Sequence, residues 1–249
     1  MTSGYTARQV RDAEAPHLAA GEPLMQRAAH GLATEIRRVL DAAPGALGAS
    51  GEPEQERERS PRGVLLLVGS GDNGGDALFA GAELAAGGVE VRAIGVGSRM
   101  HGAGSEAARA AGVRFVESAP EALPALLRET AVIVDGILGT GTTAGRPALR
   151  GAARELVQGI RAELAALSRE LPEGAAAPLV VAVDIPSGID PDSGETADDV
   201  VLAADLTVTF GGVKAGLLRG QGPRLAGDVV LVEIGIEGDL AAVEPAVRT

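Results

Sequence analysis

Short apolar runs that end in glycine-rich polar segments are the clearest pattern along this chain. The first run is Val64–Val68, and Gly69–Gly75 follows it with the letters G-S-G-D-N-G-G. Five consecutive apolar residues are typical of a strand that is buried on both faces of a parallel sheet. A helical pattern starts at about Ala77, so the segment predicts the first half of a βαβ unit. Glycines there let the backbone approach a ligand, and the helix N-terminus favours an anion.

Two later segments repeat this design. Residues 132–141 read V-I-V-D-G-I-L-G-T-G, and residues 180–190 read V-V-A-V-D-I-P-S-G-I-D. Their strands end in Asp135 and Asp184, and the carboxyl ends of parallel strands meet at one edge of a sheet, where open α/β folds bind ligands. The pattern therefore predicts a polar cleft at this edge. Two simpler interpretations stay open: a strand-end aspartate that only caps the next turn, and a glycine loop that is only a tight turn.

The remaining pattern predicts alternating helices and strands in a single domain that spans residues 1–249. The expected elements are helices near 6–14 and 23–40, a strand at 89–95, a helix at 104–111, a strand at 113–116, helices at 119–129 and 149–171, and strands at 205–210 and 227–232. Thr6 is the expected N-cap of the first helix. We therefore expect an α/β fold, a three-layer αβα Rossmann-like sandwich around a mostly parallel sheet.

Three segments lie outside this alternation. Residues 41–62 combine Pro, Gly and Ser with the charge run Glu52–Arg59, which predicts a flexible surface insertion. Residues 238–249 are rich in Ala, Val and Glu, and we expect a tail there without a capping element. The two N-terminal helices precede the first strand and carry apolar faces, which favours a homodimer.

Composition narrows the classes of function. The 249 residues include 22 Lys and Arg against 34 Asp and Glu, a net charge of −12, which argues against binding to nucleic acid or to an anionic membrane. The sequence has no cysteine, which excludes disulfides, thiolate nucleophiles and cysteine zinc sites. Neither a leader pattern nor an apolar run of about 18 residues is seen. We therefore expect a cytoplasmic protein.

Gly69, Gly71 and Gly74 fit G-x-G-x-x-G, which raises the alternative of an NAD-dependent oxidoreductase. Such an enzyme needs an acid at the end of the second strand to hold the ribose. The only carboxylate of the expected second strand, Glu90, lies near its start. A P-loop is excluded because no G-K-[ST] closes the run.

Five motifs together resemble the NAD(P)H-hydrate epimerase family. They are G-S-G-D-N-G-G-D, V-D-G-I-L-G-T-G, V-D-I-P-S-G-I-D, A-D-L-T-V-T-F-G-G-V-K-A-G-L-L and G-D-V-V-L-V-E-I-G-I, in the family's order, and the match extends over residues 5–236. The resemblance implies an isomerase that interconverts the R and S forms of hydrated NADH and NADPH, a repair of nicotinamide nucleotides. A non-catalytic nucleotide-binding regulatory protein is the other alternative that stays open.

The resemblance also implies site residues by position. The implied substrate-binding residues are Asp72, Asn73, Gly74, Gly75, Asp76, Gly139, Thr140, Gly141, Thr142, Thr143, Ala144, Gly145 and Asp184. A potassium ion is implied at Asn73, Asp135 and Ser187, and one carboxylate with neutral oxygens suits a large monovalent cation. The chain departs from the family at Asp72, where many members have Asn, and at Ala77, which replaces a common Gly and is expected to narrow the loop.

Inversion at the hydrated carbon needs a group that moves a proton to and from the hydroxyl. Cysteine is absent and no histidine is well placed, so carboxylates remain as candidates. We expect Asp184 to be catalytic, because Asp135 is expected to hold the ion. His101 is either a proton shuttle or an exposed loop residue. Lys214 and Arg146 each belong either to the cleft or to the ordinary surface.

The resemblance implies two partners besides the substrate. It points to a homodimer, as do the apolar faces of the N-terminal helices. Some family members continue into a dehydratase domain that consumes one epimer. We therefore expect a fused or separate dehydratase, and we expect this chain to be, or to derive from, the front half of a larger two-function enzyme.

Overall fold

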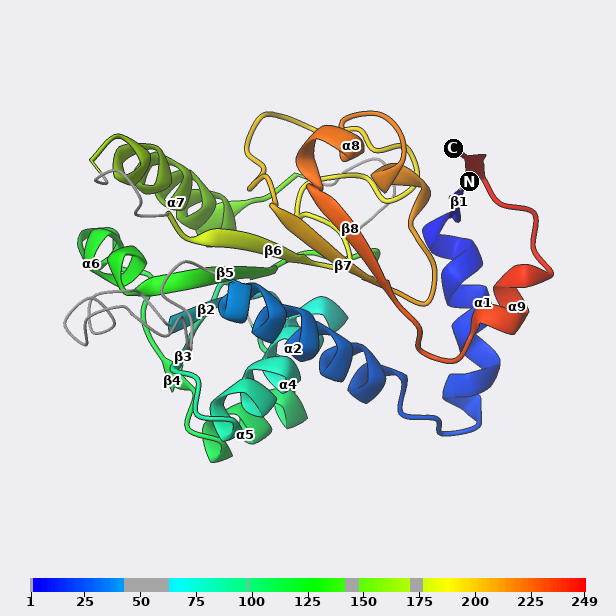
Figure 1. Cartoon of the computed structure of the whole chain (residues 1–249), viewed down its shortest axis with the longest axis horizontal. Helices are drawn as coiled ribbons and strands as arrows, with labels where there is room; N and C mark the ends of the chain where they lie inside the picture. Colours follow the sequence, from blue (N-terminus) through cyan, green and yellow to red (C-terminus); the bar gives the residue numbers. More distant parts are fainter. Residues whose placement is uncertain (1, 43–62, 98, 142–147, 171–176) are drawn as a thin grey trace.

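The computed structural model describes residues 2–42, 63–97, 99–141, 148–170 and 177–249, and a seven-stranded sheet lies at the centre of this part of the chain (Figure 1). In spatial order the strands are β4 (Arg114–Phe115), β3 (Val91–Gly95), β2 (Gly63–Val68), β5 (Thr130–Gly136), β6 (Leu179–Val183), β7 (Leu206–Phe210) and β8 (Asp228–Val232). Each strand runs parallel to its neighbours. The expected α/β fold with a parallel sheet is confirmed.

Helices cover both faces of this sheet. One face carries α2 (Leu24–Ala42), α4 (Asp72–Ala86) and α5 (Gly102–Ala110), and the other carries α6 (Leu123–Arg128), which follows the short 3-10 helix η1 (Pro120–Ala122), and α7 (Gly151–Glu170). The alternation of β2 explains the two layers. Val64, Leu66 and Val68 belong to the core under α2 and α4, whereas Leu65 and Leu67 belong to the core under α6 and α7. The predicted αβα sandwich is therefore confirmed.

The direction in which the chain moves across the sheet reverses between β2 and β5. From β2 the chain passes outward through β3 to β4, returns to β5 beside β2, and continues through β6 and β7 to β8. Open α/β sheets with such a reversal bind ligands in the crevice outside the carboxyl ends of their strands. The predicted motifs follow β2, β5 and β6, so the topology brings them to one edge.

The first glycine-rich motif is mostly helix rather than loop. α4 begins at Asp72, not near Ala77, so only residues 69–71 make the turn after β2. A Cβ on Gly74 would lie 2.3 Å from the carbonyl oxygen of Gly69. Glycine is needed there for close packing, although it is a poor helix former. Ala77 is fully buried inside α4 and therefore does not narrow a loop.

The N-terminal segment packs against the sheet and its strand ends. β1 (Ser3–Gly4) leads to α1 (Ala7–Ala19), and Thr6 is its N-cap as predicted: its hydroxyl accepts from the Gln9 N–H at 3.2 Å, and the Gln9 side chain accepts from the Thr6 N–H at 2.8 Å. α2 crosses one face of the sheet, where Gly31 lets it lie against Val232 of β8. Both helices therefore bury most of their apolar positions within the chain, although Leu18 of α1 is exposed, and the homodimer stays a prediction.

The last residues also form regular structure, which corrects the expected tail without a capping element. After β8, α9 (Glu237–Ala241) packs on α1, and β9 (Val247–Arg248) pairs antiparallel with β1. The Thr2 N–H donates to the Thr249 carbonyl at 2.7 Å. Because the two strands lie at opposite ends of the chain, no local pattern indicates their pairing.

α2 is longer than the sequence predicts. It continues to Ala42, so residues 41 and 42 are helical and do not belong to an insertion. The rest of the expected insertion, residues 43–62, lies outside the described residues. In the described ranges, no helix is long and apolar enough to cross a membrane.

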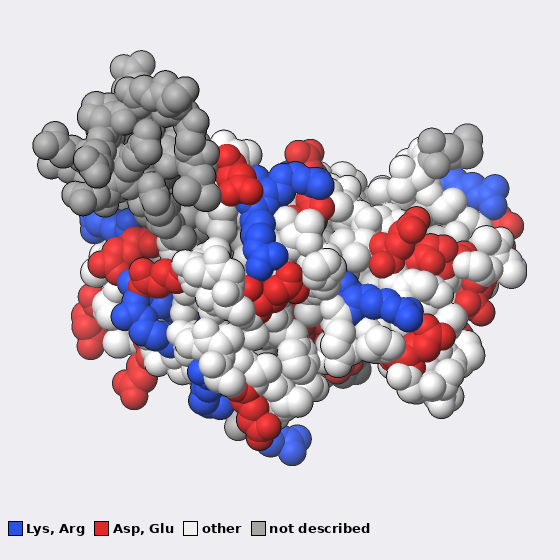
Figure 2. Space-filling model, turned by 60° about the horizontal axis from the view of Figure 1, so that its bottom comes forward, with Lys and Arg blue, Asp and Glu red and all other residues white. Residues whose placement is uncertain are grey.

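Charged side chains of both signs are interspersed over the face that α2, α4 and α5 cover (Figure 2). Arg37 of α2, for example, lies 3.0 Å from Glu83 of α4. Exposed pairs of this kind contribute about 0–1 kcal/mol each. The packing of the two apolar cores, rather than these charges, therefore stabilises the fold.

His17 joins α1 to α9 in a pH-dependent way. Its ring nitrogens lie 2.9 Å from Asp239 and 2.8 Å from Glu22, and the hydrogen bonds to these carboxylates raise the pKa of His17 above its ordinary value of 6.5. Because the pKa of a base is raised on folding, the contact stabilises the fold at low pH and is lost as the pH rises through the raised pKa.

We expect α9 to be better protected from hydrogen exchange, after correction for intrinsic rates, at about pH 5.5 than at about pH 8.5. His17→Gln should abolish this difference, and equal protection of the wild type at both values would contradict the prediction.

Candidate active site

The segments after β2 and β5 pack so closely that two glycines in them have no room for a side chain. A Cβ on Gly69 would lie 1.8 Å from the Ile137 carbonyl oxygen, and a Cβ on Gly139 would lie 2.2 Å from Asn73 Oδ1. Any side chain at either position would push the two segments apart. A Cβ on Gly71, at the start of α4, would instead meet nothing within 4 Å. Gly69 and Gly139 therefore serve packing, whereas Gly71 leaves the helix N-terminus open to a ligand.

Gly69→Ala is expected to lower the free energy of unfolding by about 3 kcal/mol or more, because the methyl group would overlap the Ile137 carbonyl. Gly71→Ala is the matched control, and we expect it to cost less than about 1 kcal/mol. Urea denaturation of both variants beside the wild type measures the difference. If the two variants were equally stable, the packing role of Gly69 would be wrong.

Asp135 is wholly buried near the end of β5 and is held by Ser187. Its Oδ1 accepts from the Ser187 hydroxyl at 2.6 Å and from the Ile137 N–H at 3.3 Å, and its Oδ2 accepts from the Ser187 N–H at 2.8 Å. Burial raises the pKa of Asp135, and the hydrogen bonds from Ser187 and Ile137 oppose this rise. Two of the three residues predicted to hold a cation are therefore in direct contact.

Asn73, the third of these residues, lies beside them. Its Nδ2 donates to the Val183 carbonyl at 2.5 Å and to the Leu138 carbonyl at 3.3 Å, and the Ser187 hydroxyl lies 3.4 Å from the same Leu138 oxygen. A carboxylate, a hydroxyl, an amide and two carbonyl groups thus converge from three strand ends. This donor set fits a large monovalent cation. In the part of the chain that the structure describes, no cluster of three or more His, Cys, Asp or Glu suited to a metal occurs. The set around Asn73 differs from such a cluster because it has one carboxylate and otherwise neutral oxygens.

Asp184 follows β6 in an unusual backbone conformation. Its φ is 66°, and no other non-glycine residue in the described ranges has a positive φ; this conformation costs on the order of 1–3 kcal/mol. The turn directs the side chain to β7, where Oδ1 accepts from the Thr209 hydroxyl at 3.0 Å and from the Phe210 N–H at 3.2 Å. No hydrogen bond from a described residue reaches Oδ2. One carboxylate oxygen is therefore anchored, and the other is left for a ligand.

Lys214 is the charged partner of Asp184. Its side chain is 3% exposed, and Nζ donates to Asp184 Oδ1 in a short contact and to the Phe210 carbonyl at 2.8 Å. The interpretation of Lys214 as an ordinary surface lysine is wrong, because the residue is buried just after the end of β7, whereas its role in a cleft stays a prediction. Removal of one partner from a buried ion pair costs about 3–5 kcal/mol, since the other charge is left unpaired. The pair therefore fixes the geometry of the Asp184 carboxylate.

Two further carboxyl groups that were predicted to bind substrate lie on α4. Asp72 is exposed at the helix start, whereas Asp76 is 6% exposed. Burial, followed by the charges of Asp184 and Asp72, raises the pKa of Asp76 well above its ordinary value. Oδ1 of Asp76 is enclosed and has no hydrogen-bond partner among the described residues. The protonated form of Asp76 is therefore favoured.

The second glycine loop is described only at its beginning. The Thr140 carbonyl accepts from Arg11 of α1 at 3.0 Å, and Gly141 is exposed beside it. The predicted substrate-binding residues 142–145 lie outside the described residues. The same is true of Arg146, so neither interpretation of that arginine is tested.

His101 has a role that neither interpretation of the sequence included. Its Nδ1 accepts from the Gly104 N–H at 3.0 Å as the N-cap of α5, and its ring packs edge-on against Phe79 of α4. The ring also closes the space beside Gly75, where a Cβ would lie 3.2 Å from its Cγ. His101 therefore holds α5 against α4.

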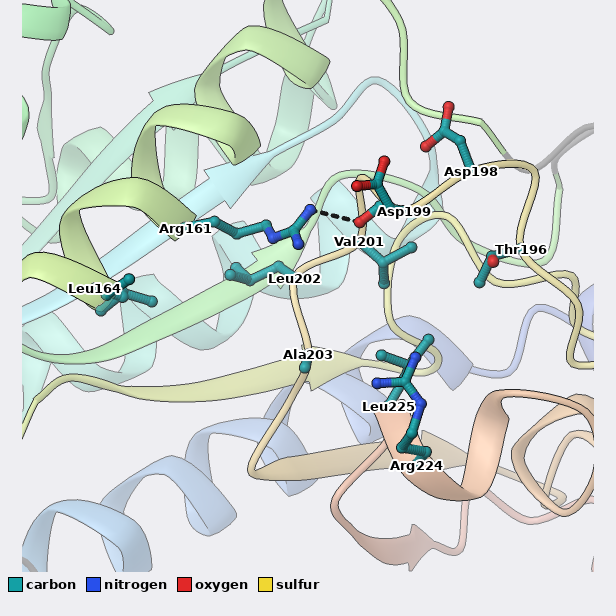
Figure 3. Close-up of a pocket in the computed structure, with 11 residues that line it drawn as sticks. Arg161, Leu164, Thr196, Asp198, Asp199, Val201, Leu202, Ala203, Arg224 and Leu225 are labelled. Carbon is teal, nitrogen blue, oxygen red and sulfur yellow. Dashed lines mark hydrogen bonds between the residues drawn. The ribbon is translucent and has the colours of Figure 1, made fainter. Parts of the chain in front are cut away.

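A cavity of about 470 Å³ lies away from these residues, between α7 and α8 (Gly222–Leu225) (Figure 3). Arg161 of α7 points across it and donates to the Asp199 carbonyl, and Leu164, Val201 and Leu225 supply apolar lining. None of the predicted site residues lines this cavity. The candidate site is therefore defined by the chemistry at the strand ends and not by this cavity.

Sequence reasoning left Lys214 undecided and missed Thr209. A lysine four residues after a buried strand, reached through the glycine pair 211–212, can fold back onto the strand end, and this spacing is a usable signal. Thr209 gives no signal, because threonine is common in strands whether or not its hydroxyl serves a neighbour.

The fold and the site together define an open α/β protein with polar side chains at the reversal of its strand order, where folds of this class bind ligands. A buried Asp–Lys pair lies there beside Asn73, Asp135 and Ser187, the three residues predicted to hold a cation and called the cradle below. The profile of a family described as "YjeF-related protein N-terminus" matches residues 21–216. An NAD(P)H-hydrate epimerase of Microbacterium testaceum is 46% identical over 98% of this chain and 83% of its own length, and one of Clavibacter sepedonicus is 45% identical over 100% and 96%. The chain belongs to this family, which confirms the resemblance that its motifs carry.

Two other proteins are similar to this chain. A bifunctional NAD(P)H-hydrate repair enzyme Nnr of Mycobacterium tuberculosis is 40% identical over 95% of this chain, but the match covers only 42% of its own length. The crystal structure of the yeast protein ynu0 matches 92% of this chain and 86% of its own with a TM-score of 0.65. At 18% identity, that match shows the fold alone.

Proposed function

We propose that this protein is an isomerase that interconverts the R and S forms of hydrated NADH and NADPH and so repairs nicotinamide nucleotides. Family membership and the names of relatives at 45% and 46% identity support this function. The observation in the structure that carries it is the Asp184–Lys214 pair. It fixes one carboxylate oxygen and leaves the other at the ligand-binding edge of the sheet.

The reaction needs proton transfer and no change of oxidation state. Water adds to the enamine double bond of a reduced nicotinamide at the carbon next to the ring nitrogen. For inversion, the hydroxyl on this carbon takes up a proton, the C–O bond breaks and water leaves, while the nitrogen lone pair stabilises the cation. Water then adds to the opposite face and releases a proton. The protein therefore has to hold the ring, move one proton at each step and place a water.

We assign proton transfer to Asp184 Oδ2. Thr209, Phe210 and Lys214 all contact Oδ1, so the second oxygen keeps a defined position without forming a hydrogen bond of its own in the described part of the chain. A positioned carboxylate of this kind contributes about 10²–10⁴-fold to a rate.

The open helix N-terminus and the glycine loops are the proposed substrate contacts. Residues 72–76 of α4 and residues 139–141 after β5 lie on either side of the cradle. The N–H groups of the first helical turn suit the diphosphate of a dinucleotide. We propose that residues 142–145 complete this surface.

We further propose a potassium ion at Asn73, Asp135 and Ser187, supported by the converging oxygens described above. When bound, the ion supplies a fixed positive charge between the two substrate-binding segments. The chain contributes a single carboxylate, Asp135, with neutral hydroxyl, amide and carbonyl groups, a set that disfavours a small divalent ion that demands more charge.

Incubation of the purified protein with each separated epimer, followed by chromatography, tests the proposed function. We expect either pure epimer to yield the same mixture only when the protein is present. Formation of oxidised nucleotide would instead indicate an oxidoreductase. Saturable binding of the hydrated nucleotide without conversion would indicate a non-catalytic nucleotide-binding protein.

Further proposals concern organisation. We infer that residues 1–249 form one domain, that the protein is cytoplasmic, and that it acts with a fused or separate dehydratase. We also propose a homodimer, because Val229 and Leu231 on the edge strand β8 are exposed apolar residues that a second copy would cover. A single monomeric species in sedimentation velocity at about micromolar concentration would overturn the dimer.

A further inference from the structure

α1 lies across the carboxyl ends of the central strands. The Tyr5 N–H donates to the Val213 carbonyl at 2.8 Å in the loop after β7, and Arg11 donates to the Thr140 carbonyl at 3.0 Å in the loop after β5. β6, which Asp184 follows, lies between these two strands. Figure 1 shows the helix beside the end of β7. α1 therefore lies beside the sheet edge at which the sequence predicts a cleft.

Glu14 lies on the side of α1 that faces this cleft. It follows Val10 by four residues and Arg11 by three, so the three side chains share one face of the helix. Val10 is 3% exposed and lies against Gly212, where a Cβ would be 3.5 Å from its Cγ2. Glu14 itself is half-buried. In the described ranges its carboxylate forms no hydrogen bond or ion pair, whereas Asp12 on the exposed side pairs with an arginine at 3.5 Å.

The charges that act on Glu14 are those of the site itself. They belong to Lys214 after β7, Asp184 after β6, Asp72 at the start of α4 and Arg11 on α1, and Asp76 is coupled to Glu14 as well. Burial raises the pKa of Glu14, the charge of Lys214 opposes this rise, and the charges of Asp184 and Asp72 add to it. Glu14 therefore keeps its proton to a higher pH than a surface glutamate does.

We propose that Glu14 is a second catalytic residue of this site and exchanges a proton with the substrate hydroxyl on the face of the ring opposite to Asp184. The proposal rests on the proposed epimerase function and adds a residue to it. Inversion removes the hydroxyl from one face of the ring and adds it to the other. A single fixed carboxylate reaches only one face, so a group on each side of the ring is needed.

One proton shared by the two carboxyl groups balances the reaction. In one direction, Glu14 gives its proton to the hydroxyl, the C–O bond breaks and one water leaves. A water then adds to the other face of the cation and gives a proton to Asp184. The reverse reaction starts with the proton on Asp184 and ends with it on Glu14. Two carboxyl groups in different environments are a usual arrangement for acid and base roles.

Asp76 is another carboxyl group near the site with a raised pKa, besides the buried Asp135, but its position is less suitable. It is 6% exposed, and its Oδ1 is enclosed by protein. Glu14 has a longer side chain and belongs to the helix that lies beside the strand end at Asp184. Asp76→Asn therefore serves as a comparison, because it removes another carboxyl group of raised pKa.

The test compares kcat, KM and the pH profile of kcat for the wild type, Glu14→Gln, Glu14→Asp and Asp76→Asn. Asp12→Asn is the matched control, since it removes one carboxylate from the exposed face of the same helix. We expect Glu14→Gln to lower kcat by about 10²-fold and to remove the ionisation on the alkaline side of the profile. KM should stay within about threefold of the wild type. Glu14→Asp should restore the ionisation, and Asp12→Asn should change nothing.

Three results would overturn the role of Glu14. They are a kcat of Glu14→Gln within about threefold of the wild type, a loss confined to KM with the pH profile intact, or loss of the alkaline ionisation in Asp76→Asn instead. The wild type separates this proposal from the function on which it rests. A wild type that does not interconvert the epimers overturns both, whereas an active wild type with an unaffected Glu14→Gln overturns only the second.

Discussion

Asp184→Asn is expected to lower kcat by about 10²–10⁴-fold, because the amide keeps the shape of the side chain but cannot exchange a proton with the substrate. The backbone should tolerate the change, since asparagine adopts a φ near the observed 66° as readily as aspartate does. Substrate binding should be largely kept, because the helix N-terminus and the glycine segments are untouched. Single-turnover and steady-state measurements with separated epimers give kcat and KM for this variant.

The same substitution has a structural cost that must be separated from catalysis. It leaves the Lys214 ammonium group buried without its counter-charge, and we expect the free energy of unfolding to fall by about 3 kcal/mol or more. Lys214→Met removes the other charge. We expect the double variant Asp184→Asn/Lys214→Met to be more stable than either single variant, because the charge left unpaired is gone.

Urea denaturation and turnover of the four proteins decide between the two effects. If Asp184 transfers the proton, the double variant regains stability but its turnover stays low. If turnover returns with stability, the loss in the single variant was structural, and proton transfer would have to move to Asp76 or Asp135. A single variant with full activity would contradict the assignment directly.

The sequence predicts the main sheet well because its signals are local. The apolar runs at 64–68, 132–134 and 180–183 became β2, β5 and β6 in the predicted order, since only a strand buried on both faces needs such a run. The start of α4 was predicted too late because glycine opposes a helix by propensity, and tertiary packing against Gly69 overrides this propensity. The pairing of β1 with β9 depends on residues at opposite ends of the chain, which no window of sequence compares.

The residues of the site also fall into two groups, those that a local sequence pattern predicts and those that it does not. Asp135 and Ser187 could be placed together because Asp135 lies near the end of β5 and Ser187 follows β6 at the same edge of the sheet. The structure joins them by two hydrogen bonds, and the Ile137 N–H donates a third to the Asp135 carboxylate. Glu14 could not be placed, because its helix precedes the sheet and its position over the strand ends depends on contacts with distant loops. Residues carried by strand ends are therefore predictable from motifs, and residues carried by a covering helix are not.

Asp135→Asn is expected to weaken potassium binding by about 10²–10³-fold, since it removes the one negative charge of the cradle at a buried position. The amide cannot accept every hydrogen bond that the carboxylate accepts from Ser187 and Ile137, so the cradle also loses part of its internal support. Substrate binding should weaken with the loss of the ion, because the proposed substrate-binding segments, residues 72–76 and 139–141, adjoin the residues of the cradle.

Ser187→Ala is the control that keeps the charge. It removes one neutral oxygen and should weaken potassium binding less than Asp135→Asn does. Asp184→Asn should leave potassium affinity unchanged, because no contact joins its carboxylate to the cradle in the described part of the chain. Titration of potassium at fixed nucleotide, and of nucleotide at fixed potassium, gives both affinities and their coupling, which must be reciprocal. Unchanged potassium dependence in Asp135→Asn would show that the ion, if it binds, is held elsewhere, and the buried carboxylate would then serve only to join β5 to the turn after β6.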